Sequence, residues 1–440
     1  MGDRTTSVAC YDAATVVDTS GRLADGTSTE RSNDTDVGRW VAQGKPPGLL
    51  RRLGRALLVK RFQVILLAWC VALTAILFMP DPTGYGVDTH VYAGAYQDML
   101  AGHDAYTTAH PASTRQGDHR TLVFRPPPPA ALVGGAIASL PYGDWLWFLF
   151  NCAALSAAFL IVRSLVPAAH GPDGALSAPW RTVAAAAAWF FFQPNLQELA
   201  YGNQQAVVAL GMALAAWGIV RQRRSAAGIG VGLAAIVKAW PAVFLLPLLL
   251  QRRWRELAYA SGFALGVVVL SAAVVGPAPW IDFVHTLLSS SVGEVASAGY
   301  NMAPLASILP AAPSWFWICS TMVAVAAAGR LRPAPALAAA IAGFLLFWPV
   351  SWLHYAGIAL VGIGVLLAEE PRLAPSLALA YVLFGGSVNV AWLPATLLLG
   401  AAAWCPHRVL HAQMHVHQWL IGAHPDEQAP AGELVRPVGG

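Results

Sequence analysis

The stretch Leu257–Ile281, LAYASGFALGVVVLSAAVVGPAPWI, follows the basic sequence RRWR at 252–255 and contains no charged residue. An α-helix needs about 20 consecutive apolar residues to cross the hydrocarbon layer of a bilayer. The stretch is therefore long enough to form one membrane span. Outward along the chain, the windows 62–80, 145–162 and 199–220 also lack charge and have a similar length. The four windows predict membrane spans.

The composition of the whole chain agrees with these windows. Of its 440 residues, 56% are hydrophobic and 11% are charged, whereas a soluble domain carries about 25% charge. Longer charge-free stretches at 295–329, 333–368 and 373–407 exceed one crossing, and the last two must fold back at Pro, Gly or polar residues. We predict an all-α polytopic membrane protein with about twelve transmembrane helices. The net charge of +4 lies mostly beside span ends, so no nucleic-acid partner is implied.

The basic residues predict the orientation of the spans. With the cluster before residue 62 held in the cytoplasm, the first span delivers the polar segment 81–125 to the outer side. Residues 126–143 are apolar but short and Pro-rich at their start, and we interpret them as a re-entrant or interfacial element. The later basic clusters then all fall inside. The alternative, in which 126–143 spans, moves two arginine clusters to the outer side.

This topology divides the chain into three parts. Residues 1–50 are predicted to be a disordered cytoplasmic tail, 51–407 a transmembrane domain, and 408–440 a second cytoplasmic tail. The transmembrane domain has two outer loops, at 81–125 and 278–302. The expected localisation is the plasma membrane. The five cysteines show no paired spacing, so no disulfide or metal framework is predicted.

Asp88 lies in the sequence GYGVDTHVYAGAY, residues 84–96, a few positions beyond the outer end of the first span. If a helix begins at Asp88, its side chain caps free backbone N–H groups, and Tyr92 and Tyr96 follow on the same face as interfacial anchors. In the functional interpretation, Asp88 is a general base at the membrane surface. The residues alone leave both interpretations open.

Lys238 is a single cation between two apolar pieces, 225–237 and 239–251. A lysine at mid-membrane costs roughly 2.5–3.5 kcal/mol unless it reaches the interface or finds an anion. Snorkelling to the interface is one explanation. The other is a functional site in which the phosphate of a lipid supplies the anion.

Neutral polar and aromatic side chains gather at the same predicted face. Amides bind hydroxyl groups at a lower desolvation cost than charges do, so they suit a sugar, although helix capping and interhelical bonding explain them equally well. In WPVSWLHY, residues 348–355, the histidine adds a titratable donor among aromatic residues. The candidates are Asn203, Gln204, Gln205, Trp352 and His354, with Tyr300 and Asn301 in the second loop.

The order of these motifs resembles family 87 of the GT-C glycosyltransferases, from about residue 60 to 400. The motifs are Gly86-x-Asp88-x3-Tyr92, Phe124-Arg-Pro-Pro, Gly202 with the amides that follow it, Gly232-x5-Lys238-x2-Pro241 followed by RRWR, and Pro349-Val-Ser-Trp352-x-His354. Members of this family resemble polyprenyl-phosphate-sugar-dependent transferases, including α-1,2-mannosyltransferases and an arabinofuranosyltransferase of the cell envelope. The resemblance implies a GT-C-like bundle with an active site on the extracytoplasmic face.

The resemblance also implies roles for individual residues. Asp88 matches the catalytic aspartate, Lys238 the donor-phosphate lysine, and His354 a motif position near the site. Arg125 stands where the family usually has Tyr, and Asn203-Gln204-Gln205 replaces a Gly-Gln-x-Asn order. We assign Lys238, Arg125 and His354 to the donor phosphate. Tyr92, Asn203, Gln204, Gln205, Trp352, Tyr300 and Asn301 are assigned to the sugar or acceptor.

These assignments predict an inverting transfer of a sugar from a polyprenyl-phosphate donor to a glycolipid or lipoglycan acceptor, with Asp88 as general base. Mannose is the expected sugar, and arabinofuranose is the alternative within the family. No cofactor is firmly implied, and dependence on a divalent metal stays open because the loop carboxylates are scattered. A lipid or solute transporter is the rival class, but it would place polar sites near the midplane.

Overall fold

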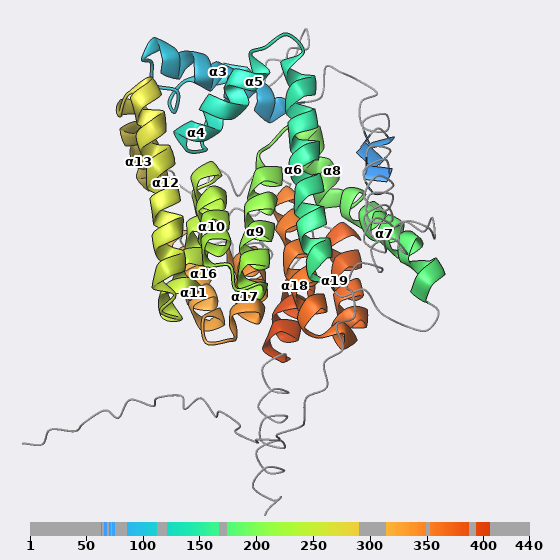
Figure 1. Cartoon of the computed structure of the whole chain (residues 1–440). Coiled ribbons are helices and arrows are strands. Elements are labelled where there is room, and N and C mark those ends of the chain that lie inside the picture. The colour runs from blue at the N-terminus through green and yellow to red at the C-terminus, as the bar shows by residue number, and fades with distance from the viewer. Residues whose placement is uncertain are drawn as a thin grey trace, which may run out of the picture. The chain divides into compact units, whose positions relative to one another are not determined.

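The structure is a computed structural model of the whole chain. It describes residues 86–111, 121–166, 174–289, 314–348, 353–386 and 393–404, with isolated positions between 63 and 74. Residues 1–58 and 59–440 are separate units, and every described residue belongs to the second. The described part is mostly helical (Figure 1), as the sequence predicts. The predicted first span at 62–80 and both predicted tails lie largely outside the described residues.

Among the described residues, two helices are long and apolar enough to cross a membrane, namely α6, Gly143–Leu165, and α12, Trp254–Val275. Other apolar helices are shorter. They are α9 (Gln205–Val220), α10 (Arg224–Val237), α16 (Ser314–Ala328), α17 (Pro333–Phe347), α18 (Ala359–Glu369), α19 (Ala374–Gly386) and the helix Leu393–Trp404. The count of about twelve spans therefore stays a prediction.

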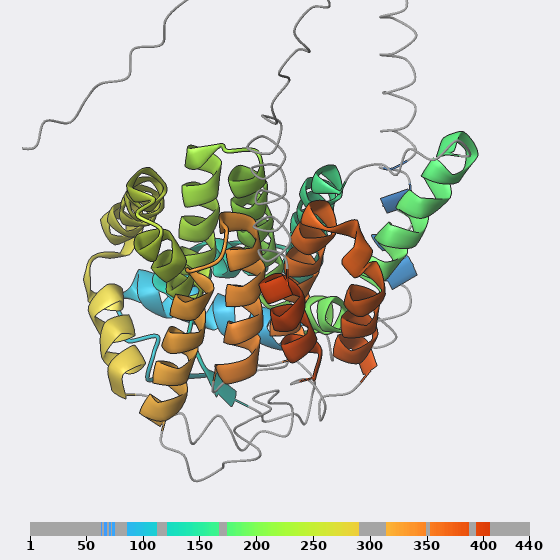
Figure 2. The ribbon, with the colours of Figure 1, turned by 90° about the horizontal axis from the view of Figure 1, so that it is seen from below.

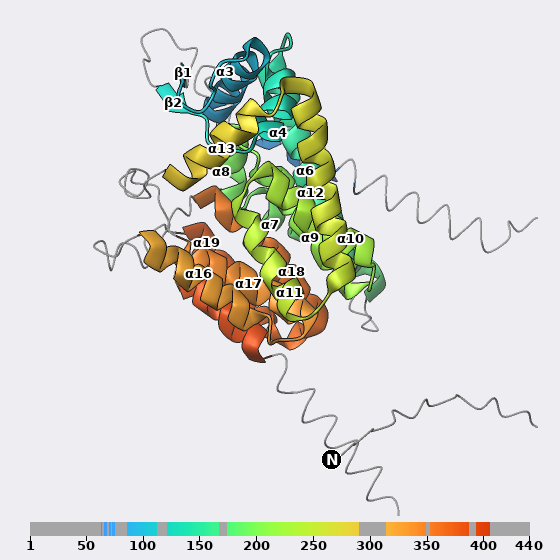
Figure 3. The ribbon, with the colours of Figure 1, turned by 90° about the vertical axis from the view of Figure 1, so that its left-hand side faces the viewer.

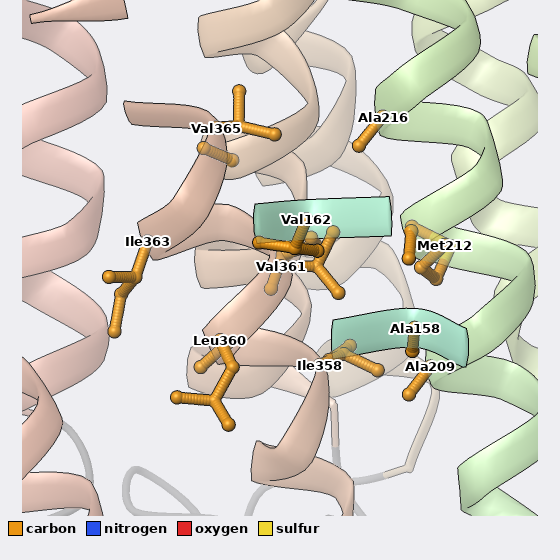
Figure 4. Packing of buried hydrophobic residues seen from close by; sticks show 14 of the residues in the cluster. Ala158, Val162, Ala209, Met212, Ala216, Ile358, Leu360, Val361, Ile363 and Val365 are labelled. Atoms are coloured by element: carbon orange, nitrogen blue, oxygen red, sulfur yellow. The ribbon is translucent and has the colours of Figure 1, made fainter. Parts of the chain in front are cut away.

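Small residues bring the central helices together. Gly211 of α9 and Gly230 of α10 face each other so closely that a Cβ at Gly211 would lie 2.7 Å from the Gly230 carbonyl oxygen. Such close backbone approach is typical of helix packing in membranes, where van der Waals contact drives association. Figure 4 shows larger side chains, including Val162 of α6, Met212 of α9 and Val361 of α18, filling the space between their helices.

The carboxyl-terminal helices pack in chain order. Helix α17 contacts both α16 and α18 (Figure 2). Most of its side chains are buried. Its run of alanines lets α16 and α18 approach closely, because small side chains allow a short distance between helix axes. Between α18 and α19, η4 (Pro371–Leu373) forms a short connecting turn. These helices form one side of the core.

A layer of short elements covers one end of the bundle (Figures 1 and 3). Helix α3, Val87–Ala101, packs against a broken helical segment made of α4 (Pro128–Ala130), η1 (Ala131–Gly135) and α5 (Ala136–Ala138). Strands β1 (Ala109–Pro111) and β2 (Thr121–Val123) pair antiparallel beside α3. Helix α13, Ala278–Ser289, follows α12 and contacts α4.

The broken segment supports the interpretation of residues 126–143 as an element that does not span. Its eleven helical residues, 128–138, reach about 16 Å, roughly half the thickness of a bilayer core. A Cβ at Gly135 would lie 2.3 Å from the Tyr92 carbonyl oxygen, so the segment is pressed against α3. Its position against α3 fits a re-entrant or interfacial element, which stays a prediction.

Three predicted span boundaries differ from the structure. The apolar stretch 182–197, whose hydropathy also predicts a span, is interrupted, because α7 (Gly174–Phe190) ends before Pro194 and α8 (Gln193–Tyr201) begins there. The window 199–220 starts its helix only at Gln205, after a turn. The window 239–251 divides into η2 (Trp240–Phe244) and α11 (Leu245–Leu250). Pro at the first turn of a helix favours a new start, which explains the breaks at Pro194 and Pro241.

Candidate functional site

Asp88 is the second residue of α3, and it does not cap that helix. The N-cap is Gly86, in the left-handed conformation at φ 82°, with no side-chain hydrogen bond. The Asp88 carboxylate instead accepts a hydrogen bond of 2.5 Å from Asn203 Nδ2. The interpretation of Asp88 as an N-cap is therefore wrong. Its side chain reaches out of its own helix toward the turn between α8 and α9.

Gly202 allows that turn to approach α3. It adopts φ 66°, and a Cβ there would lie 2.1 Å from Thr89 Oγ1, so any larger residue would collide with α3. Two hydrogen bonds hold the approach in place. Gly86 N donates to the Ala200 carbonyl at 3.1 Å, and Trp147 Nε1 donates to the Gly202 carbonyl at 2.6 Å. The backbone thereby fixes Asn203 beside Asp88.

The two glutamines after Asn203 are also buried. Gln204 Nε2 donates to the Ala130 carbonyl at 2.8 Å, which ties the turn to the broken segment 128–138. Gln205 is 2% exposed, and neither polar atom of its side chain has a hydrogen-bond partner among the described residues. An unpartnered buried amide costs about 1–3 kcal/mol, so a site of this kind suits a ligand with hydroxyl groups.

Lys238 ends α10 and is 5% exposed. Its backbone is extended, and its Nζ lies 4.4 Å from the centre of the Tyr355 ring, in a cation–π contact. The Trp240 ring stacks on the Tyr355 ring, and the two ring centres lie 5.3 Å apart. The lysine therefore lies against the Tyr355 ring, and the snorkelling interpretation does not fit a side chain with so little exposure.

Electrostatics connect Lys238 to the carboxylates of the site. Its charge acts on Asp88 of α3 and on Glu198 of α8, and both acids act on it in return. Glu198 is 1% exposed, and its Oε1 accepts a hydrogen bond of 2.9 Å from Ala206 N. A buried cation is tolerated only with such partners. The charge of Lys238 is thus balanced by two acids from different helices, Asp88 of α3 and Glu198 of α8.

Burial raises the pKa of the Asp88 carboxyl group above its ordinary value. The hydrogen bond from Asn203 and the positive charge of Lys238 both act in the opposite direction, but burial has the larger effect. Asp88 lies in the layer outside the spanning helices. A carboxylate whose proton affinity is raised is a better base than a solvated aspartate, so this environment suits proton abstraction.

His354 lies at the edge of the same group. It is 5% exposed, and its ring packs edge-on to Tyr201 at 6.4 Å and to Tyr355 at 4.9 Å. Helix α8 and the turn η3, Leu353–Ile358, are in contact. The structure thus brings His354 next to the residues that surround Lys238.

The remaining predicted residues are placed differently. Tyr92 is 2% exposed and packs in an aromatic cluster with Phe124 and Trp147, at 6.0 and 6.2 Å. Arg125 is exposed, on the chain between β2 and α4. Trp352, Tyr300 and Asn301 lie outside the described residues. The roles of all these residues stay predictions. Among the described residues, no group of three His, Cys, Asp or Glu side chains could hold a metal ion.

Glu198 is the residue of the site that the sequence analysis missed. It is the only charged residue between positions 182 and 220, a region otherwise read as two spans and a turn. A carboxylate alone in an apolar stretch is a functional candidate for the same reason that a lone lysine is. That signal was present in the sequence, at the same strength as the one that singled out Lys238.

Fold and site together define a class, a helical membrane protein in which an acid, amides and a lysine are buried beneath an outer layer that carries a second acid, Asp88. The sequence model of glycosyltransferase family 87 matches residues 124–334, just under half of the chain. This agrees with the resemblance in the motifs and indicates a membrane glycosyltransferase. The match includes the amides and Lys238, whereas Asp88 and His354 lie outside it. A comparison with curated proteins gave no match.

Proposed function

We propose that the protein is an inverting glycosyltransferase that takes its sugar from a polyprenyl-phosphate donor. Asp88 removes the proton from an acceptor hydroxyl, whose oxygen forms a bond to the anomeric carbon of the sugar. The bond between that carbon and the phosphate oxygen breaks, and the phosphate leaves with the electron pair. No covalent intermediate with the protein is needed.

One observation carries this proposal: a carboxylate from the outer layer and a buried cation from the end of α10 act on each other's charge. The two residues, Asp88 and Lys238, are far apart in sequence, and the hydrogen bond from Asn203 holds the Asp88 carboxylate where the charge of Lys238 acts on it. Transfer needs a base at the acceptor and a positive charge at the leaving phosphate. The site offers both in one place.

Lys238 is proposed to stabilise the negative charge that grows on the departing phosphate. A fixed cation in a site of low dielectric constant stabilises such charge more than a solvated one does. His354 and Arg125 are proposed to assist as further donors to the phosphate. Lysine suits this role because it binds phosphate as a point charge.

The neutral polar groups are proposed to hold the sugar and the acceptor. Gln205 supports this because its buried amide has no partner among the described residues. Asn203 is proposed to keep Asp88 in position while contacting a hydroxyl. Tyr92, Trp352, Tyr300 and Asn301 complete the set of proposed contacts, and mannose is the proposed sugar. A glycolipid or lipoglycan is the proposed acceptor, on the extracytoplasmic face of the plasma membrane.

A transfer assay tests this function. The purified protein is incubated in detergent or liposomes with radiolabelled polyprenyl-phosphate mannose and a set of lipid acceptors, and labelled product is separated from the donor. Polyprenyl-phosphate arabinofuranose is tested in parallel, because it is the alternative donor. We expect labelled glycolipid with inverted anomeric configuration. If none of several lipid-linked donors gives product, the transporter interpretation gains support and the proposed activity is rejected.

A further inference from the structure

A second charged site lies at the other end of the helices. A cavity of about 900 Å³ opens between the α9–α10 turn, the α11–α12 turn and the α16–α17 turn. Helix α9 begins beside the proposed active site at Gln205 and ends at Val220, next to these turns. The turns that line the cavity therefore lie at the opposite end of the helices from α3 (Figure 1). None of the proposed catalytic residues lines it.

The cavity is strongly positive. Five arginines line it against one carboxylate, Glu256. That carboxylate is already engaged, because Arg253 Nη2 and Nε donate to Glu256 Oε1 at 2.7 and 3.0 Å. The other lining arginines are Arg224, Arg252, Arg255 and Arg330, all exposed. Clustered arginines with one occupied acid favour an anionic ligand, above all a phosphate, which guanidinium groups bind in a bidentate way.

One donor atom without a partner and the beginnings of three helices belong to residues that line the cavity. Arg253 Nη1 is buried and has no hydrogen-bond partner among the described residues, although its other nitrogens are bonded. Helices α10, α12 and α17 all begin at the cavity, and none of these beginnings has a side-chain cap. Free N–H groups and the positive ends of helix dipoles favour anions. Gln251 holds the wall by donating to the carbonyls of Gly329 and Leu331 at 3.2 and 3.0 Å.

Arg252 occupies a position that glycine would fill better. It adopts φ 54°, in the left-handed region just after α11, where any side chain is strained relative to glycine. Gln222 has the same conformation, at φ 56°, in the turn after α9, and it lines the same cavity. The two positions share the same backbone conformation, and only Arg252 carries a charge, so they form a matched pair for experiments.

The surroundings of the cavity favour a lipid as the source of the phosphate. Trp254 at its rim is 61% exposed, and α12 then presents exposed apolar side chains along its length, such as Leu265 and Val269 at 62% and 61%. Such a surface faces the bilayer, since exposed apolar side chains in a spanning helix contact acyl chains. A basic pocket at the end of spanning helices is a known kind of site for phospholipid headgroups.

We propose that this cavity binds the phosphate of an anionic phospholipid from the leaflet opposite to the proposed active site. The headgroup lies among the arginines of the three turns, and the acyl chains lie along α12. The proposal is independent of the transfer reaction, because it uses none of its residues.

Native mass spectrometry of the purified, delipidated full-length protein tests it, with phosphatidylglycerol as the probe and phosphatidylcholine and inorganic phosphate as comparisons. The variants form two matched pairs. Arg252→Gly removes a charge from the cavity, whereas Gln222→Gly relaxes the same backbone strain without a charge change. Arg330→Gln removes a second charge, whereas Arg372→Gln removes an exposed arginine outside the cavity.

We expect phosphatidylglycerol to bind more tightly than phosphatidylcholine. Arg252→Gly and Arg330→Gln should each weaken it by about fivefold, whereas Gln222→Gly and Arg372→Gln should change it by less than about twofold. Both glycine variants should elute and melt like the parent protein or better, which separates lost binding from lost folding. Equal weakening by Arg330→Gln and Arg372→Gln would mean unspecific attraction and overturn the proposal. Binding of inorganic phosphate with the affinity of phosphatidylglycerol would overturn the lipid as its source.

Discussion

Asn203 Nδ2 donates a hydrogen bond of 2.5 Å to Asp88 Oδ2, and this contact joins the α8–α9 turn to the first turn of α3. Asn203 itself is fixed from two sides. Its Oδ1 accepts from Gln204 N at 2.7 Å, and its N donates to the Glu198 carbonyl at 3.3 Å. Its amide therefore presents its N–H group to Asp88 with little freedom to turn away. The proposed base, Asp88, is held by a neutral donor, so its negative charge is not neutralised by that contact.

Replacing Asp88 by asparagine should abolish transfer and leave folding intact. The substitution keeps the size of the side chain and removes the base, so we expect transfer to fall by at least about a hundredfold. The labelled-donor assay measures it, with size-exclusion elution as the check of folding. Asp98→Asn is the control, since Asp98 lies on the same helix and pairs only loosely with His103 and His110, at 3.8 and 3.9 Å. Near-normal transfer by the Asp88 variant would remove this residue from its role.

Replacing Asn203 by alanine should shift the pH dependence of transfer. Burial raises the pKa of Asp88, and the Asn203 hydrogen bond lowers it. Without that bond the pKa of Asp88 rises further, so the carboxylate is protonated at higher pH. The acid limb of the profile of kcat/KM should therefore move to higher pH than in the parent protein. Gln97→Ala is the control, because Gln97 is an exposed amide on α3, the helix that carries Asp88. An unshifted or lowered limb would contradict the role of Asn203.

Replacing Lys238 by methionine should reduce transfer whether or not stability is restored. The change leaves Glu198 buried without its positive partner, which should lower the melting temperature. The second substitution, Glu198→Gln in the same chain, removes the unpaired acid and should recover the melting temperature. Transfer should stay at least about a hundredfold below the parent in the double variant, because the phosphate still lacks its cation. Recovery of both quantities together would show a purely structural lysine.

Replacing Gln205 by leucine should separate binding from stability. The leucine fills a similar volume and removes two buried polar atoms that have no partner among the described residues. We expect an unchanged or higher melting temperature. If the amide holds a sugar hydroxyl, KM for donor or acceptor should rise by about tenfold. Unchanged KM values for both substrates would exclude this contact.

Replacing Gly202 by alanine should destabilise the protein by about 1–2 kcal/mol and impair transfer, because of the left-handed backbone and the contact with Thr89. The double variant with Thr89→Ala removes the collision and keeps the backbone strain, so it should recover part of the loss. Gly266→Ala, where a Cβ would meet nothing within 4 Å, is the control and should be neutral. Thermal unfolding in detergent measures all three. Equal unfolding temperatures for the Gly202 and Gly266 variants would mean that the turn tolerates a side chain.

The sequence predicted several parts of this site for reasons that are local. Lys238 stands out because a cation between two apolar helices is costly wherever the helices pack. The structure places Lys238 directly after α10, between the two apolar pieces 225–237 and 239–251. The ends of α8, near Pro194 and Gly202, were harder to predict from the sequence. Their position depends on how proline and glycine fit a neighbouring helix, and a hydropathy window averages over that.

The sequence by itself indicated the protein family and predicted a membrane environment. Long charge-free windows need lipid, because water would not solvate them, and the motif order indicated the family that the comparison then matched. The tertiary structure decided which polar residues meet. Asp88 gained Asn203 as its partner instead of capping its own helix, and Glu198 joined the site through α8. A hydrogen bond between residues 88 and 203 depends on Gly202 letting α3 approach, and such long-range packing leaves no periodic trace along the chain.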